Sequence, residues 1–144
     1  MKNKDLVGNV IVETAAQAAV LFRAELPKEQ KEERVWVLPL DATGKVLSKP
    51  ILVSVGHQDG TVAIDAGTIF REALKAGAEE VIVAHNHPSG DLTPSKADLE
   101  TTKRLKEASK LLSVDFLDHL IIGTSDSSES TGFVSIIEEF AQRV

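Results

Sequence analysis

A strand pattern that leads directly into a histidine-rich loop is the feature that most constrains this chain. Residues 80–84 (EVIVA) have the length and the β-branched content of a buried strand. His85 and His87 follow at once, and residues i and i+2 of an extended segment point to the same side. Residues 88–91 then turn the chain, and residues 93–94 (TP) resemble an N-cap followed by the first position of a helix. The stretch therefore predicts strand, loop and helix, with both imidazole rings able to reach one ion.

An acid and a hydroxyl follow in the predicted helix. Asp98 would lie about one turn into it, and Ser95 lies three residues earlier on roughly the same face. His85, His87 and Asp98 together supply two neutral nitrogens and one anionic oxygen, the kind of set that holds Zn²⁺ in catalytic sites with a position left for water. Zn²⁺ lowers the pKa of such a water to about 7. The chain has no Cys, so a closed thiolate site is excluded.

A simpler interpretation exists for part of this pattern. Ser95-x-x-Asp98 could be only a helix capping box with a shorter acid than usual. A His-x-His pair is also a weak signal when it stands alone. The combination of both histidines, a Gly turn, Ser-x-x-Asp and the strand–loop–helix context favours the metal site.

The string HNHPSGDLTPSKAD, from His85 to Asp98, resembles the JAMM (JAB/MPN) metalloprotease motif and is similar to its RadC branch. The similarity extends from about Glu33 to Phe133 and includes FREALK before the strand and DHLIIG after the helix. The resemblance implies an α/β fold in which helices flank a mixed central β-sheet, arranged as in cytidine deaminases. It also implies a zinc cofactor and a peptide or isopeptide substrate.

The resemblance further implies a catalytic glutamate upstream, at the start of the first central strand. Glu32 and Glu33 both precede the apolar run 35–40, and alignment with the family favours Glu33 as the proton acceptor. Glu32 remains the alternative. Without the resemblance, both glutamates would be interpreted as surface acids at the end of a charged run. Ser95 would donate a hydrogen bond to the developing oxyanion, which is typically worth roughly 3–4 kcal/mol of barrier.

Other polar residues receive structural interpretations. His57 lies in a Gly-flanked loop and is expected to be exposed to solvent. His119 lies in an apolar run and is expected in the core or behind a metal ligand, rather than as a fourth ligand. Asn86, Ser89 and Asp91 are expected to order the loop around the two histidines. Any of these three residues could also contact a substrate.

The remaining pattern predicts one α/β domain. Residues 1–30 would form an N-terminal segment and helix packed on the domain, and residues 31–144 the JAB/MPN unit. Strands 34–40 and 46–55 are expected to pair as an antiparallel hairpin, with Pro39 indicating a sheet edge or a bulge. Further strands are predicted at 61–64, 114–122 and 133–136, and further helices at 15–24, 65–76 and 137–144. The helix at 94–112 would bury Leu99, Thr102, Leu105, Ala108, Leu111 and Leu112.

Composition narrows the function classes. The net charge is −6, with acids spread along the chain, which argues against strong binding to phosphate backbones. The N-terminus has no signal-peptide pattern and no apolar run reaches membrane-spanning length, so a cytoplasmic protein without membrane contact is expected. No sequence feature indicates the oligomeric state.

Three functions compete at this stage. The leading hypothesis is a zinc-dependent hydrolase of amide or isopeptide bonds, since the set Glu33, His85, His87, Ser95 and Asp98 is complete. The alternative is a RadC-type DNA repair or DNA-processing accessory, although the helix-hairpin-helix segment of longer RadC relatives is not found at this N-terminus. The third hypothesis is an inactive scaffold that binds a partner. Such a scaffold would be expected to have lost metal ligands, whereas all of them are present here. The sequence does not identify the substrate.

Overall fold

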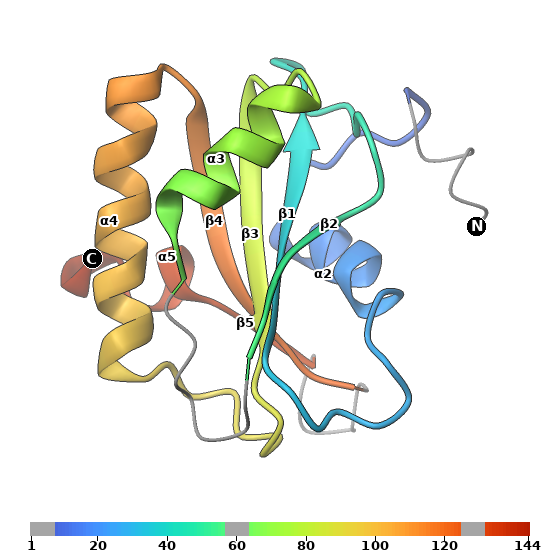
Figure 1. Ribbon diagram of the computed structural model, residues 1–144, viewed down its shortest axis with the longest axis vertical. Helices are drawn as coiled ribbons and strands as arrows, with labels where there is room; N and C mark the ends of the chain where they lie inside the picture. Colours follow the sequence, from blue (N-terminus) through green and yellow to red (C-terminus); the bar gives the residue numbers. More distant parts are fainter. Residues whose placement is uncertain (1–7, 57–63, 125–131) are drawn as a thin grey trace.

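Five strands form one mixed sheet in the order β2-β1-β3-β4-β5 (Figure 1). The computed structural model describes residues 8–56, 64–124 and 132–144. Strands β3 and β4 are parallel, and every other neighbouring pair is antiparallel, including the predicted β1–β2 hairpin. The expectation of a mixed sheet flanked by helices is confirmed. The strand bounds are β1 Arg34–Leu40, β2 Ile51–Val55, β3 Glu80–Asn86, β4 Asp115–Ile122 and β5 Phe133–Ser135.

Helices cover both faces of this sheet (Figure 1). Helix α2 packs on one face, α3 and α4 pack on the other, and short helix α5 follows β5 directly. Among the described residues, none of the helices combines the length and the apolar character needed to cross a bilayer. The helix bounds are α2 Ala15–Arg23, α3 Ala66–Lys75, α4 Lys96–Leu112 and α5 Ile136–Glu139, followed by the 3₁₀ turn Ala141–Arg143.

Alternation along the central strands divides the core into two layers. Side chains of Val35 and Val37 on β1 and of Val81 and Val83 on β3 pack toward α3 and α4. The intervening side chains, Trp36 among them, pack toward α2. Because successive residues of a strand face opposite sides, the parity of a position decides which layer its side chain enters. The same parity decides which polar residues can meet at the end of β3, where the loop with His85 and His87 begins.

The predicted start of the helix at 94–112 and the predicted edge or bulge at Pro39 both differ from the structure, for identifiable reasons. Helix α4 begins at Lys96 with Ser95 as its N-cap, and not at Thr93-Pro94. The reason is a reciprocal pair of hydrogen bonds: Ser95 Oγ accepts the Asp98 N–H, and Asp98 Oδ2 accepts the Ser95 N–H. Pro39 lies in an interior strand, with β2 on one side and β3 on the other. It is tolerated because β2 pairs with β1 only over residues 34–37.

The end of α4 also differs from the predicted pattern. The buried stripe runs through Asp98, Leu99, Thr102, Leu105 and Ser109, whereas Leu111 and Leu112 are 87% and 45% exposed. Leu111 lies two residues beyond Ser109, which turns it by about 200° to the far side of the helix. Two other expectations, the exposed His57 and most of the strand at 61–64, lie outside the described residues.

Candidate metal centre

Four side chains from three separate segments meet at one end of the sheet. His85 lies near the end of β3, His87 follows it, Asp98 lies in the first turn of α4, and Glu33 precedes β1. One ligand atom from each lies within 4.8 Å of the others. Parity brings Glu33 there, because it shares the face of Val35, which is paired with His85 across β1 and β3. Glu32 falls on the opposite side, is exposed, and is not part of the group.

The distances among three of these residues match the size of a small metal ion. His85 Nε2 lies 3.0 Å from His87 Nε2 and 3.2 Å from Asp98 Oδ1, and His87 Nε2 lies 3.0 Å from Asp98 Oδ2. Ligand atoms held tetrahedrally at the Zn–N distance lie about 3.3 Å from one another. Glu33 Oε1 is farther away, 3.8 Å from His85 Nε2. The geometry therefore separates three close donors from one carboxylate beside them.

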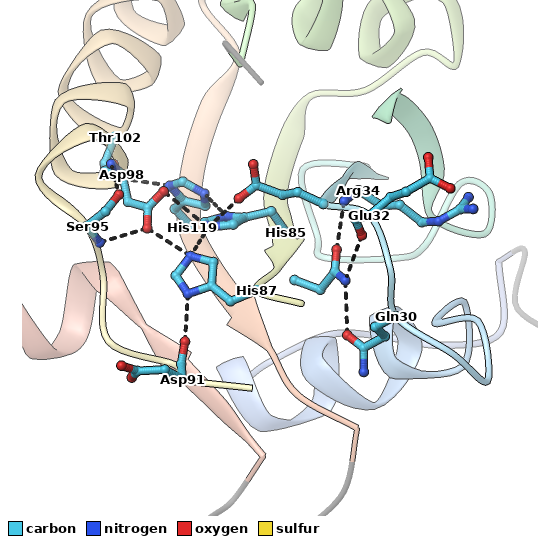
Figure 2. A network of polar contacts seen from close by, with 12 residues as sticks. Gln30, Glu32, Arg34, His85, His87, Asp91, Ser95, Asp98, Thr102 and His119 are labelled. Carbon is cyan, nitrogen blue, oxygen red and sulfur yellow. Dashed lines mark hydrogen bonds and ion pairs between the residues drawn. The ribbon is translucent and has the colours of Figure 1, made fainter. Parts of the chain in front are cut away.

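A chain of hydrogen bonds fixes the protonation pattern of the His85 ring (Figure 2). The Thr102 hydroxyl donates its one proton to the Asp98 carbonyl at 2.9 Å, so toward His119 it can only accept. His119 Nδ1, 2.8 Å from Thr102 Oγ1, is therefore the donor, and His119 Nε2 is left as an acceptor. His85 Nδ1–H donates to that nitrogen at 2.8 Å. The lone pair of His85 Nε2 is thereby turned toward the group.

The His87 ring is oriented by its own loop. Its Nδ1 lies 2.7 Å from the Asp91 carbonyl oxygen, which can only accept, so Nδ1 carries the proton and Nε2 faces Asp98 and His85. The loop is held by the Asp91 N–H donating to Ser89 Oγ and by the Thr93 N–H donating to Asp91 Oδ1. The expectation that Ser89 and Asp91 order this loop is confirmed.

The donor chemistry of the cluster fits a metal ion. While both imidazole rings are neutral, their two lone pairs and the carboxylate of Asp98 converge within 3.0–3.2 Å, and none of these atoms carries a proton. Electron-pair donors packed so closely repel one another unless a cation lies among them. Two nitrogens and one carboxylate oxygen are a ligand set that suits Zn²⁺. The group could hold a metal ion, and its chemistry leaves the identity of that ion open.

Burial and charge act differently on the ionisable groups. Burial works to raise the pKa of Asp98, but the hydrogen bonds that its carboxylate accepts from the protonated forms of the His85 and His87 rings outweigh burial and hold the pKa well below its usual range. Burial raises the pKa of Glu33, and the attraction of His85 only partly opposes this. Burial works against a charged His87, but the charged ring donates from one nitrogen to Asp98 and from the other to the Asp91 carbonyl, and these two hydrogen bonds raise the pKa of His87. Asp98 is thus the group most firmly held as an anion.

Ser95 lies at the rim of the group, at the exposed start of α4. Its N–H donates to Asp98 Oδ2 at 2.9 Å, and its Oγ accepts the Asp98 N–H at 3.0 Å. The carboxylate of Asp98 therefore belongs both to the capping box of α4 and to the group that could hold a metal ion. Because Ser95 Oγ accepts in this pair, its O–H can still donate to another oxygen.

Sequence reasoning found some supporting residues and missed others. His119 lies behind His85 and is completely buried, as expected, and burial holds its pKa well below the ordinary value. The role of the Thr102 hydroxyl was missed, although a threonine within the apolar stripe of a helix is a signal for a buried hydrogen bond. Asn86 was expected to order its own loop, but its side chain bonds to residues 30–34 instead.

The chain resembles known proteins over most of its length. The family model described as RadC-like JAB domain matches residues 12–139. A UPF0758 protein of Thermosynechococcus vestitus, tlr1707, is 42% identical over 116 residues, which is 81% of this chain and 45% of that protein. A UPF0758 protein of Flavobacterium johnsoniae is 39% identical over 126 residues, or 88% of this chain and 52% of that protein.

A third relative, a UPF0758 protein of Carboxydothermus hydrogenoformans, is 47% identical over 94 residues, covering 65% of this chain and 41% of that protein. The chain thus spans about half the length of the curated relatives it matches. Their names state no activity. The family match includes β1, the histidine loop and α4, the three segments that build the cluster. On this match the chain belongs to the RadC-like JAB domain family.

Proposed function

We propose that this domain is a zinc-dependent hydrolase of amide or isopeptide bonds. The observation that carries the proposal is the convergence of His85, His87 and Asp98 beside a second carboxylate, Glu33, that reaches the cluster from another strand. A purely structural site would need only ligands. A nearby acid that is not among the closest donors is what hydrolysis requires, since a ligand carboxylate is a poor proton carrier.

His85, His87 and Asp98 would hold Zn²⁺ as its three protein ligands, which leaves a coordination position free. When bound, Zn²⁺ polarises a carbonyl oxygen and lowers the pKa of water. His119 and the Asp91 carbonyl keep the two imidazole rings turned toward the ion. The Ser95 N–H does the same for the carboxylate of Asp98.

Two further residues would perform the chemistry of bond cleavage. Glu33 accepts a proton from the attacking water and passes it to the leaving amine, so its carboxylate ends the reaction as it began. The Ser95 hydroxyl donates a hydrogen bond to the oxygen of the substrate carbonyl as negative charge develops on it, which is typically worth roughly 3–4 kcal/mol. Both roles need side chains that a substrate can approach, and Ser95 is exposed while Glu33 is partly so.

Metal content is the first experiment. Elemental analysis of the wild type should find about one zinc per chain, and His87→Ala should lose it, since three ligands become two. Glu33→Gln is the matched control, because it removes the proton acceptor and should keep the zinc. Absence of bound metal from the wild type, even after zinc is added, would overturn the proposal.

Cleavage is the second experiment, on a panel of peptide-linked and isopeptide-linked substrates. Zinc-loaded wild type should cleave at least one substrate that zinc-loaded Glu33→Gln leaves intact. Failure on every substrate with zinc bound would count against hydrolysis. Nucleic-acid processing has no comparable support, because the net charge is −6. DNA binding that weakens steeply with salt in a gel-shift series would favour that alternative.

A further inference from the structure

Asn86 lies between the two histidines in sequence, but its side chain faces the opposite layer of the sheet. It is completely buried. Its Oδ1 accepts the Arg34 N–H at 2.7 Å, and its Nδ2 donates to the Glu32 carbonyl at 3.2 Å and to Gln30 Oε1 at 3.0 Å. One amide therefore bonds to the backbone on both sides of Glu33.

These bonds restrain the conformation of Glu33 itself. The Glu32 carbonyl belongs to the peptide group before the Glu33 Cα, and the Arg34 N–H belongs to the peptide group after it. Because peptide groups are planar, fixing both of them fixes the two backbone dihedrals of Glu33. The second peptide group is held from its other side as well, since the Gly56 N–H donates to the Glu33 carbonyl at 2.8 Å. The direction in which the Glu33 side chain leaves the backbone is thus determined.

Backbone pairing between β1 and β3 does not reach this point of the sheet. The β1–β3 register ends at the pair Val35 and His85, so Glu33 lies beyond the ladder. The Asn86 side chain supplies the next connection in its place. Its orientation is decided by its partners, because a flipped amide would direct its N–H₂ at the Arg34 N–H and its oxygen at the Glu32 carbonyl. A side chain with both a donor and an acceptor is required here.

We propose that Asn86 is the positioning residue for Glu33, holding its carboxylate beside the imidazole of His85. The catalytic meaning of this placement rests on the proposed function, but the placement itself does not. His85, Asn86 and His87 then act together: the two histidines face the metal cluster, and the residue between them sets the distance to the proton acceptor. Asn86 contacts neither substrate nor ion in this role.

The position of Glu33 can be measured directly in the metal-free protein. In wild type, nuclear Overhauser contacts are expected between the Glu33 γ-methylene and the His85 ring, because Glu33 Oε1 lies 3.8 Å from His85 Nε2. Asn86→Ala should lose this contact and the exchange protection of the Arg34 amide, while contacts between Val35 and His85 persist. A general loss of structure would remove both sets. Retention of the Glu33 contact in Asn86→Ala would overturn the proposal.

Two further variants keep the test decisive. Gln30→Ala removes one acceptor of Asn86 and leaves both bonds that flank Glu33, so the Glu33 contact should survive. Asn86→Asp keeps the shape and the acceptor for Arg34 but turns an oxygen toward the Glu32 carbonyl, so it should weaken the contact even if Asn86→Ala does not fold. An unchanged contact in Asn86→Asp would contradict the proposal.

Zinc binding separates this inference from the proposed function. Asn86→Ala should keep about one zinc per chain, because its ligands are intact. If wild type binds no zinc but the Glu33 contact depends on Asn86, the hydrolase proposal fails and the positioning stands. If zinc binds and Glu33 keeps its place in Asn86→Ala, the positioning fails alone.

Discussion

Two buried carboxylates in this protein are nearly equally exposed, but their pKa values are shifted in opposite directions. Asp98 on α4 is 7% exposed and Asp118 on β4 is 6% exposed. Burial works to raise the pKa of Asp98, but hydrogen bonds from the protonated forms of two imidazole rings outweigh burial, so this pKa lies well below its usual range. Burial raises the pKa of Asp118, and its hydrogen bonds only partly oppose this. Burial therefore does not decide the charge of a carboxylate here, whereas its partners do.

The partners of Asp118 explain its different task. Its carboxylate accepts from the Ser135 hydroxyl at 2.6 Å, from the His119 N–H at 2.8 Å and from the Ile137 N–H at 3.3 Å. These bonds connect β4 with the end of β5 and the first turn of α5. None of the three partners is an imidazole ring. Asp118 is placed to secure the C-terminal segment, and Asp98 belongs to a group that could hold a metal ion.

Zinc affinity should separate the two carboxylates most strongly. Asp98→Asn removes the anionic ligand at constant shape, and the affinity should fall by more than the roughly 10–100-fold that loss of a supporting residue costs. Asp118→Asn is the matched control and should bind zinc as wild type does. Competition with a chromophoric chelator measures both. Equal losses in the two variants would show that the comparison is mistaken.

His119 tests whether support behind a ligand matters as much as its geometry suggests. His119→Phe keeps an aromatic ring but removes the acceptor of the His85 Nδ1–H, so zinc affinity should fall roughly 10–100-fold. Thr102→Ser keeps a hydroxyl on the same helix face and should change affinity little. Zinc binding by His119→Phe at wild-type strength would mean that the ring of His85 needs no such partner.

Stability of the metal-free protein should respond to pH with opposite signs at the two sites. The raised pKa of Asp118 means that its favourable contribution is present below its unfolded pKa and is lost as the pH rises through its folded pKa. The lowered pKa of Asp98 gives a contribution that is present above its unfolded pKa and is lost as the pH falls.

Urea unfolding between pH 3 and pH 7 measures this difference, with each Asn variant compared with wild type at every pH. As the pH rises, the free energy of unfolding of Asp118→Asn should increase relative to that of wild type. The free energy of unfolding of Asp98→Asn should decrease relative to that of wild type. Slopes of the same sign would contradict the assignment of the two environments.

The smallest expected effect concerns the start of α4. Ser95→Ala removes the N-cap and should lower the free energy of unfolding by about 1 kcal/mol. Thr93→Ala should change it far less, because α4 begins after Thr93. Thermal unfolding of both variants is a sufficient measurement. A larger loss at Thr93 would restore the helix start expected from the sequence pattern.

The parts of the site that are close together in sequence could be predicted best. His85, His87 and Asp98 lie within 14 residues of one another, and strand alternation, a Gly turn and a helix start orient all three. The error at the helix start arose because Thr93 and Ser95 are both good N-caps. Ser95 becomes the cap because Asp98 can return its hydrogen bond.

Supporting residues whose partners are distant in sequence could not be assigned in the same way. The three bonds of Asn86 join residues 52 to 56 positions apart, and His119 meets His85 across 34 positions. The local sequence pattern indicates only that these polar residues lie in apolar strands. It does not say which backbone group or ring they will meet, because that depends on strand order.

The sequence by itself determined the ligand types, the strand–loop–helix that carries them, and the mixed α/β character of the fold. Only the tertiary structure decided which glutamate lies beside them: pairing of Val35 with His85 brings Glu33 to the cluster and turns Glu32 away. It also decided the opposite pKa shifts of Asp98 and Asp118. The reason is that periodicity and capping act over a few residues, whereas register, burial and electrostatic environment exist only once distant segments have packed together.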